Sequence, residues 1–188
     1  MRYLVASKSA AGHLPKGSRI VADGETISFE QPWTFSAPLV ALLPEDADLG
    51  ALQAGLKGAG CNGFAVEGQD LPADGQGFVL GGHIMRDRAG FQPYAEAVPG
   101  VVKSFGGRFL VRGGAVTPLA GSFVPERVVF AEYADPETAL AWYTSASYAP
   151  LLKIRLATTE ARLVIMARSG PLPAAVHAKA EKFLSERA

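Results

Sequence analysis

The sequence has little of what most metal, redox and disulfide-stabilised sites are built from. It contains one cysteine, Cys61, so an intramolecular disulfide is excluded and a reducing, cytoplasmic environment is expected. Its three histidines, His13, His83 and His177, are scattered along the chain. None lies at metal-ligand spacing with Cys, Asp or Glu, and we therefore expect no metal site.

The chain also lacks an excess of charge and any long apolar run. Its 18 basic residues balance its 18 acidic residues, whereas a nucleic-acid or anionic-membrane partner needs a basic face. The longest apolar runs, such as 38–44 and 162–167, are strand-sized and too short to span a bilayer. Residues 1–9 contain no long apolar core, which argues against a signal peptide. We expect a cytoplasmic protein that binds neither nucleic acid nor membrane.

Motifs for nucleotide cofactors are also missing. Gly58 to Gly63 satisfies G-x-G-x-x-G literally, but a dinucleotide site needs this loop after a strand and before a helix. Here the expected order is helix, glycines, strand, so the glycines are interpreted as the end of a helix. We expect no cofactor.

What the sequence does contain is a series of short strands and helices on both sides of a polar segment. Residues 69–76, rich in Gly, Gln, Asp and Pro, are interpreted as a linker. Residues 1–68 then form a small α+β N-terminal domain, with a hairpin turn predicted at Asp23-Gly24. Its expected elements are strands at 2–6, 19–22, 26–29, 39–43 and 64–67, and a helix from Asp46 or Asp48 to Lys57.

Residues 77–170 predict the order β-α-β-β-α-β, followed by a terminal helix within 171–188. Pro99 interrupts the first helix, where it lacks the amide that would bond the carbonyl of Ala95. Asp135 is expected to cap the second helix. The strands are expected at 78–86, 108–118, 126–133 and 162–168. The helices are expected at 91–105 and from 136 toward 148, where the second helix breaks before Pro150 and can resume through Leu156.

One of these strands carries arginines at two-residue spacing. The alternation of a strand places Arg108, Leu110 and Arg112 on one face. Phe109 and Val111 are then expected on the other face.

A set of segments in residues 77–170 resembles a known family. The segments are Tyr94 with Val98-Pro99, Gly-Gly-Arg-Phe-Leu-Val-Arg-Gly-Gly at 106–114, Pro125-Glu126-Arg127, Trp142-Tyr143, Ser147-Tyr148 and Arg155. Together they resemble a bacterial family, domain of unknown function 1330. The resemblance implies an α+β, ferredoxin-like fold of the dimeric α+β barrel type, preceded here by the N-terminal domain. It also implies a homodimer, because a second subunit covers the open sheet face; alternatively, the N-terminal domain covers that face itself.

The resemblance further implies a pocket between sheet and helices, as in related cofactor-free oxygenases and isomerases. We expect His83, Arg112 and Glu132 to reach it from three strands, and Tyr94 and Trp142 from the two helices. His83 and Glu132 are the candidate catalytic groups, Arg112 is the candidate anchor for a small carboxylate, and the two aromatic residues are candidate ligand contacts.

Each of these residues also has a structural interpretation. His83 is alternatively a surface or hydrogen-bonded histidine of the sheet, and Arg112 alternatively pairs with Glu132. The aromatic residues are alternatively core or dimer contacts. The sequence therefore predicts a small-molecule-binding protein or a cofactor-free enzyme acting on a small organic acid. A structural homodimer or a ligand-binding module without catalysis stays open.

Overall fold

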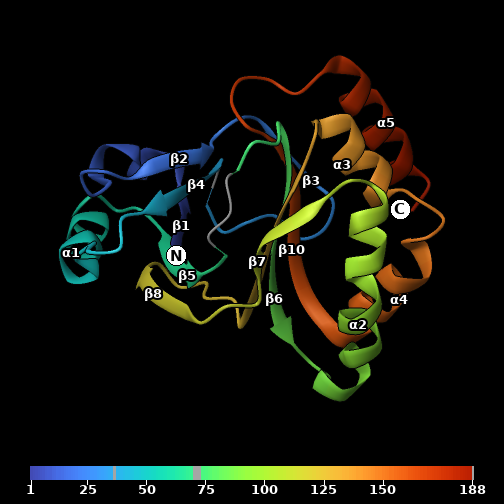
Figure 1. The fold of residues 1–188 in the computed structure, drawn as a ribbon, viewed down its shortest axis with the longest axis horizontal. Helices are drawn as coiled ribbons and strands as arrows, with labels where there is room; N and C mark the ends of the chain where they lie inside the picture. Colours follow the sequence, from blue (N-terminus) through green and yellow to red (C-terminus); the bar gives the residue numbers. More distant parts are fainter. Residues whose placement is uncertain (36, 70–72, 188) are drawn as a thin grey trace.

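The computed structural model describes residues 1–35, 37–69 and 73–187, which form two antiparallel sheets packed face to face (Figure 1). Sheet A has the strand order β2-β4-β1-β5-β8, and its strands are β1 (Arg2–Ser7), β2 (Arg19–Ala22), β4 (Pro38–Leu43), β5 (Gly63–Glu67) and β8 (Val116–Ala120). Sheet B has the order β3-β10-β6-β9-β7, and its strands are β3 (Thr26–Ser28), β6 (Gly77–Met85), β7 (Arg108–Arg112), β9 (Arg127–Tyr133) and β10 (Thr159–Ala167).

Helices cover the outer face of each sheet, so the molecule has four layers (Figure 1). Sheet A carries α1 (Leu49–Gly58), and a short 3-10 helix, η1 (Lys8–His13), lies beside it. Sheet B carries the remaining helices: α2 (Arg88–Ser104), α3 (Pro136–Tyr143), α4 (Ala149–Thr158) and α5 (Ala174–Ser185). None of the helices within the described residues is long and apolar enough to cross a membrane.

The alternation of side chains along each strand builds these layers. In β1, Leu4 packs toward α1 while Tyr3 faces sheet B. In β9, Phe130 lies between the two sheets, whereas Ala131 lies on the helix side. Phe78 of β6 stacks on Phe130 with ring centroids 5.0 Å apart. The inter-sheet layer is therefore a continuous apolar core made by both halves of the chain.

The helix ends follow the expected caps. Asp48 accepts hydrogen bonds from the amides of Gly50 and Ala51 and so begins α1. Asp135 accepts from the amide of Thr138 at the start of α3, as expected. The second expected helix ends earlier than its pattern indicated, at Tyr143, and α4 begins anew at Ala149.

The expected strand at 108–118 is wrong as a single element. It divides into β7, which pairs with β9 in sheet B, and β8, which pairs with β5 in sheet A. Gly113 has a positive φ of 76°, and a Cβ on Gly114 would lie 1.9 Å from the carbonyl oxygen of Glu67. The chain can cross from one sheet to the other here because these two residues lack side chains.

The expected hairpin at Asp23-Gly24 is also wrong. The strand before the turn, β2, pairs with β4 in sheet A, and the strand after it, β3, pairs with β10 in sheet B. The amides of Asp23 and Gly24 donate to the carbonyls of Arg168 and Ala167 near the end of β10. The turn residues are thus bonded to a distant strand.

The predicted faces of β7 change because of a β-bulge. The register shifts between Phe109 and Val111, so Leu110 and Val111 both enter the inter-sheet core. Phe109 packs on the helix side, and the side chain of Arg112 also lies there. Arg112 therefore shares a face with Phe109, opposite to the expectation.

The two halves of the chain are interleaved. The first half supplies β3 to sheet B, and the second half supplies β8 to sheet A. The division into domains 1–68, 77–170 and 171–188 stays a prediction, and residues 70–72 of the expected linker lie outside the described residues. The homodimer was expected because one face of the sheet would otherwise be open. Sheet A covers this face of sheet B, so the homodimer stays a prediction without this reason for it.

Candidate functional site

A cluster of buried polar side chains lies between sheet B and its helices. Its centre is Arg155 of α4, which is 0% exposed. The guanidinium forms an ion pair with Glu30, a residue that follows β3 and whose side chain is only 7% exposed. The Nε of Arg155 donates to the hydroxyl of Tyr148 at 3.0 Å, and the hydroxyl of Tyr143 donates to Glu30 at 2.9 Å. The cluster ties the N-terminal half of the chain to α4.

His83 joins this cluster as a neutral imidazole. Its Nε2 lies 3.5 Å from Nη1 of Arg155, and because a guanidinium only donates, Nε2 is the acceptor and the proton is on Nδ1. Burial, and then the positive charge of Arg155, lower the pKa of His83 from 6.5 to about 3. His83 therefore fits the hydrogen-bonded sheet histidine considered from the sequence. Its environment disfavours the protonated form.

Tyr94 and Trp142 lie in the same layer, as expected, and both contact Tyr148. The hydroxyls of Tyr94 and Tyr148 are 3.4 Å apart, and the rings of Trp142 and Tyr148 have centroids 4.2 Å apart. Burial and the neighbouring Tyr148 raise the pKa of Tyr94 well above its usual value. Both side chains are 5% exposed or less, so they pack as core residues.

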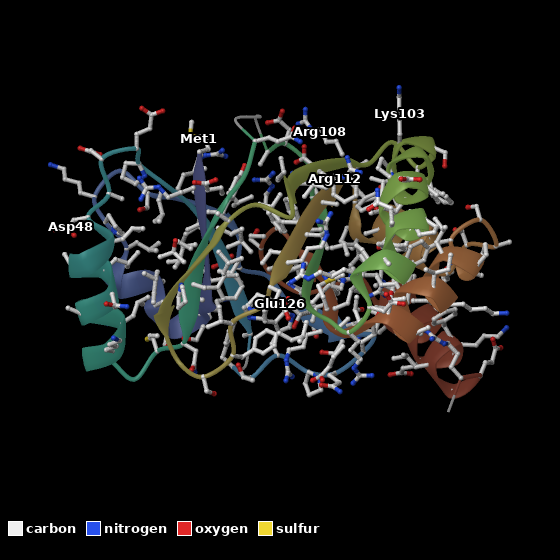
Figure 2. The ribbon with its side chains drawn as sticks, turned by 90° about the horizontal axis from the view of Figure 1, so that it is seen from below. Met1, Asp48, Lys103, Arg108, Arg112 and Glu126 are labelled. Carbon is white, nitrogen blue, oxygen red and sulfur yellow. The ribbon has the colours of Figure 1, made fainter. Side chains whose placement is uncertain are left out.

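Arg112 stabilises a helix rather than joining this cluster. Its Nη2 donates to the carbonyl oxygen of Ala95 at 2.7 Å. Pro99 lies inside α2 and has no amide to bond that carbonyl, so Arg112 supplies the missing donor. Figure 2 shows Arg112 beside the ribbon of sheet B, far from Asp48 on α1.

Glu132 lies apart from His83, and its neighbour is Arg108 rather than Arg112. Arg108 forms an ion pair with Glu132, which also accepts from the amide of Gly75 at 3.0 Å. A pocket of about 420 Å³ opens beside them, next to Asp74. The predicted meeting of His83, Arg112 and Glu132 is thus wrong. Arg108 and Glu132 are paired across β7 and β9, so the register separates Glu132 from the position of Arg112.

A second pocket lies where β6 ends and α2 begins, on the helix side of sheet B. Its volume is about 310 Å³, and we call it the Arg127 pocket. Its lining residues are Met85, Arg88, Phe91, Gln92, Ala95, Gly113, Glu126 and Arg127. Arg127 is the cross-strand partner of His83, and the ring of His83 lies 6.4 Å from that of Phe91. His83, 1% exposed, therefore lies behind the wall of this pocket.

Arg127 is the unusual group in this pocket. It is half-buried, its Nε is buried without a hydrogen-bond partner, and its guanidinium forms no ion pair with any residue that the structure describes. It lies over the ring of Phe91 at 5.6 Å, and Gly113 leaves the space that it occupies. Burial, and then the positive charge of Arg112, lower the pKa of Arg127. An anion placed here would relieve both effects.

The lining of the pocket also includes an exposed ion pair. Arg88, at the start of α2, pairs with Glu126, the residue before β9. Glu126 also accepts from the amide of Met85 at 3.3 Å. Among the described charged residues that line the pocket, Arg127 is thus the one whose charge is not paired.

The sequence reasoning did not predict Arg127, Arg155 or Glu30 as site residues, nor the pair of Arg88 and Glu126. Arg127 and Arg155 belong to segments that carry the family resemblance, so a signal for them was present. No local sequence signal pointed to Glu30, because its partner Arg155 lies 125 positions further along the chain. Within residues 1–35, 37–69 and 73–187, no group of three or more His, Cys, Asp or Glu side chains is arranged to hold a metal ion.

Comparison with known proteins adds the following. The fold search finds a crystal structure of a protein of unknown function from Rhodopseudomonas palustris, with 20% sequence identity and a TM-score of 0.44. The similarity covers 50% of this chain and 82% of that one. The curated proteins contain no match. Residues 76–169 match the domain of unknown function DUF1330. The match begins one residue before β6 and ends two residues after β10. Because this match covers half of the chain, the protein belongs to the DUF1330 family.

Proposed function

We propose that the protein binds a small organic acid in the Arg127 pocket, with Arg127 as the anchor of the carboxylate. The observation that carries the proposal is the half-buried guanidinium of Arg127, which forms no ion pair within residues 1–35, 37–69 and 73–187. A guanidinium binds a carboxylate through two parallel hydrogen bonds, and such charge-assisted bonds are stronger than neutral ones.

The composition and size of the pocket support a small ligand. Its volume of about 310 Å³ is at the lower end of the range typical of ligand sites. Phe91, Met85 and Ala95 offer apolar contacts beside the cation, and Gln92 offers a polar group. The pocket of about 420 Å³ beside Glu132 is a weaker candidate, because the carboxylate of Glu132 already pairs with Arg108 and accepts from the amide of Gly75.

The position of the pocket agrees with the fold that we propose for this half of the chain. The order β10-β6-β9-β7, with helices on one face, supports a ferredoxin-like arrangement. We further propose that sheet A takes the place of a second subunit, giving a barrel made by a single chain. The Arg127 pocket then lies between sheet and helices, where the family resemblance implies one.

The test is a titration of the protein with small carboxylates at low ionic strength, followed by the backbone amide NMR signals of the residues that line the pocket and, in the wild type, also by the signal of the Arg127 Nε–H group. We expect these signals to shift on binding. Arg127→Ala should weaken binding roughly tenfold to a hundredfold, which corresponds to about 1.5–3 kcal/mol for a hydrogen bond to a charged group.

Arg19→Ala is the matched control, because Arg19 is exposed and lies on β2 in the other sheet. It removes the same charge and should leave the affinity unchanged. Equal losses of affinity in both variants would indicate a non-specific effect of net charge, and equal binding by wild type and Arg127→Ala would refute Arg127 as the anchor.

A further inference from the structure

We infer that Glu126 restricts the Arg127 pocket to monoanions, so that its ligand is a monocarboxylate with an apolar body. This inference rests on the proposed function, because it concerns the same pocket. It names the class of acid that the pocket accepts and the residue that determines the choice.

The charges of the lining residues are the first argument. The charged residues of the lining are Arg88, Glu126 and Arg127, so the lining carries one net positive charge, and the negative charge of Glu126 stays localised beside its partner Arg88. The charge of Arg112 acts on Arg127, but Arg112 does not line the pocket, and its Nη2 donates to the carbonyl oxygen of Ala95. One ligand carboxylate therefore balances the pocket.

The position of Glu126 is the second argument. Its two carboxylate oxygens are held by Arg88 on one side and by the amide of Met85 on the other, so the negative charge is fixed at the rim. In a pocket of about 310 Å³, a second carboxylate of the ligand would lie well within one Debye length of Glu126. Like charges at this separation repel one another, and a dianion is disfavoured.

The remaining wall is the third argument. Met85 and Ala95, both partly exposed, form with the buried Phe91 the apolar part of a lining that is otherwise polar. An alkyl or aryl group attached to the carboxylate can pack there, whereas a second charged group would lose its hydration without gaining a partner. Arg88 could pair with a second carboxylate of the ligand only if its ion pair with Glu126 were broken.

The experiment compares butyrate with succinate, two four-carbon acids that carry one and two negative charges at pH 7.5. Affinities are measured by NMR titration for the wild type, Glu126→Gln and Arg127→Ala. The glutamine keeps the size of the side chain and its carbonyl can still accept from Met85, but it loses the charge and frees Arg88. We expect the wild type to prefer butyrate, and Glu126→Gln to raise the affinity for succinate relative to butyrate roughly tenfold.

Glu160→Gln is the matched control, because Glu160 forms a comparable exposed ion pair with Arg86 at 3.3 Å outside this pocket. It should leave the ratio of the two affinities unchanged. As a second variant, Arg88→Gln leaves Glu126 unneutralised, so both acids should bind more weakly and succinate should lose more than butyrate.

The outcomes separate this inference from the proposed function. If butyrate binds in an Arg127-dependent way but Glu126→Gln leaves the ratio unchanged, the inference about Glu126 is refuted while the proposed function stands. If neither acid perturbs the Arg127 signal of the wild type, both are refuted. A shift of the ratio in Glu126→Gln alone, with Glu160→Gln unchanged, supports the inference.

Discussion

Glu30→Ala should destabilise the protein by about 3 kcal/mol, because it leaves the buried guanidinium of Arg155 without its counter-ion. Arg155 is 0% exposed, and the side chain of Glu30 is 7% exposed. Removing one partner of a buried ion pair typically costs about 3–5 kcal/mol. A pocket of about 300 Å³ adjoins Glu30, so water can fill the space that alanine leaves, and we expect a value near the lower end. The pKa of Arg155 is affected first by burial, which disfavours its charge, but Tyr148 and Glu30 outweigh burial and raise it.

The assay is urea unfolding followed by circular dichroism, with the slope of the transition checked for constancy. For a protein of this size, about 3 kcal/mol corresponds to a decrease of roughly 6–12 °C in melting temperature. Glu160→Ala, which breaks the exposed pair with Arg86, is the control and should cost between about 0 and 1 kcal/mol. In a double-mutant cycle with Arg155→Met, the two changes should be strongly non-additive. A loss below about 1 kcal/mol in Glu30→Ala, or simple additivity, would refute the role of the pair.

Three further predictions follow from buried or constrained positions. The pKa of His83 is about 3 in the folded protein and ordinarily 6.5, so between these pH values the unfolded chain binds a proton that the folded protein does not. The free energy of unfolding should therefore rise with pH from about 3 to 6.5. In His83→Gln this pH dependence should be smaller, as measured by urea midpoints at pH 4.5 and 7.5. Gly114→Ala should destabilise the protein by more than about 1 kcal/mol, because the new Cβ would meet the carbonyl of Glu67. Gly100→Ala should stabilise it by about 0.5–1 kcal/mol, because a Cβ on Gly100 of α2 would meet nothing within 4 Å. Thermal melts of both variants test this, and equal effects would contradict the argument. Light scattering at micromolar concentrations should give the mass of one chain, 19.7 kDa, because sheet A already covers the apolar face of sheet B; twice that mass would show that another surface forms the homodimer expected from the sequence.

Much of the local structure was predictable because it depends on residues that are close in the chain. The caps at Asp48 and Asp135, the strands in both halves and the terminal helix follow from side chains within a few positions of each element. The free carbonyl of Ala95 is likewise implied by Pro99 alone. The family resemblance also pointed to Arg127 and Arg155, although it assigned them no role.

The assignment of strands to sheets was decided only by the tertiary structure. A turn signal such as Asp23-Gly24 describes the local backbone, but the partners of β2 and β3 are β4 and β10, which lie far away in the chain. The crossing at Gly113 and Gly114 depends on how closely Glu67 approaches, which the alternation of residues 108–118 does not reveal.

The candidate site divides in the same way. The sequence predicted a layer of charged and aromatic residues between a sheet and its helices, and His83, Tyr94 and Trp142 lie in such a layer. Only the tertiary structure decided which charges meet: Glu30 with Arg155, Arg108 with Glu132, and Arg112 with the carbonyl of Ala95. Pairing of this kind depends on strand register, where a bulge of one residue at Leu110 changes the face of every side chain after it. Among the described residues Arg127 has no ionic partner, and this depends on the packing of distant segments rather than on the residues beside it in the sequence.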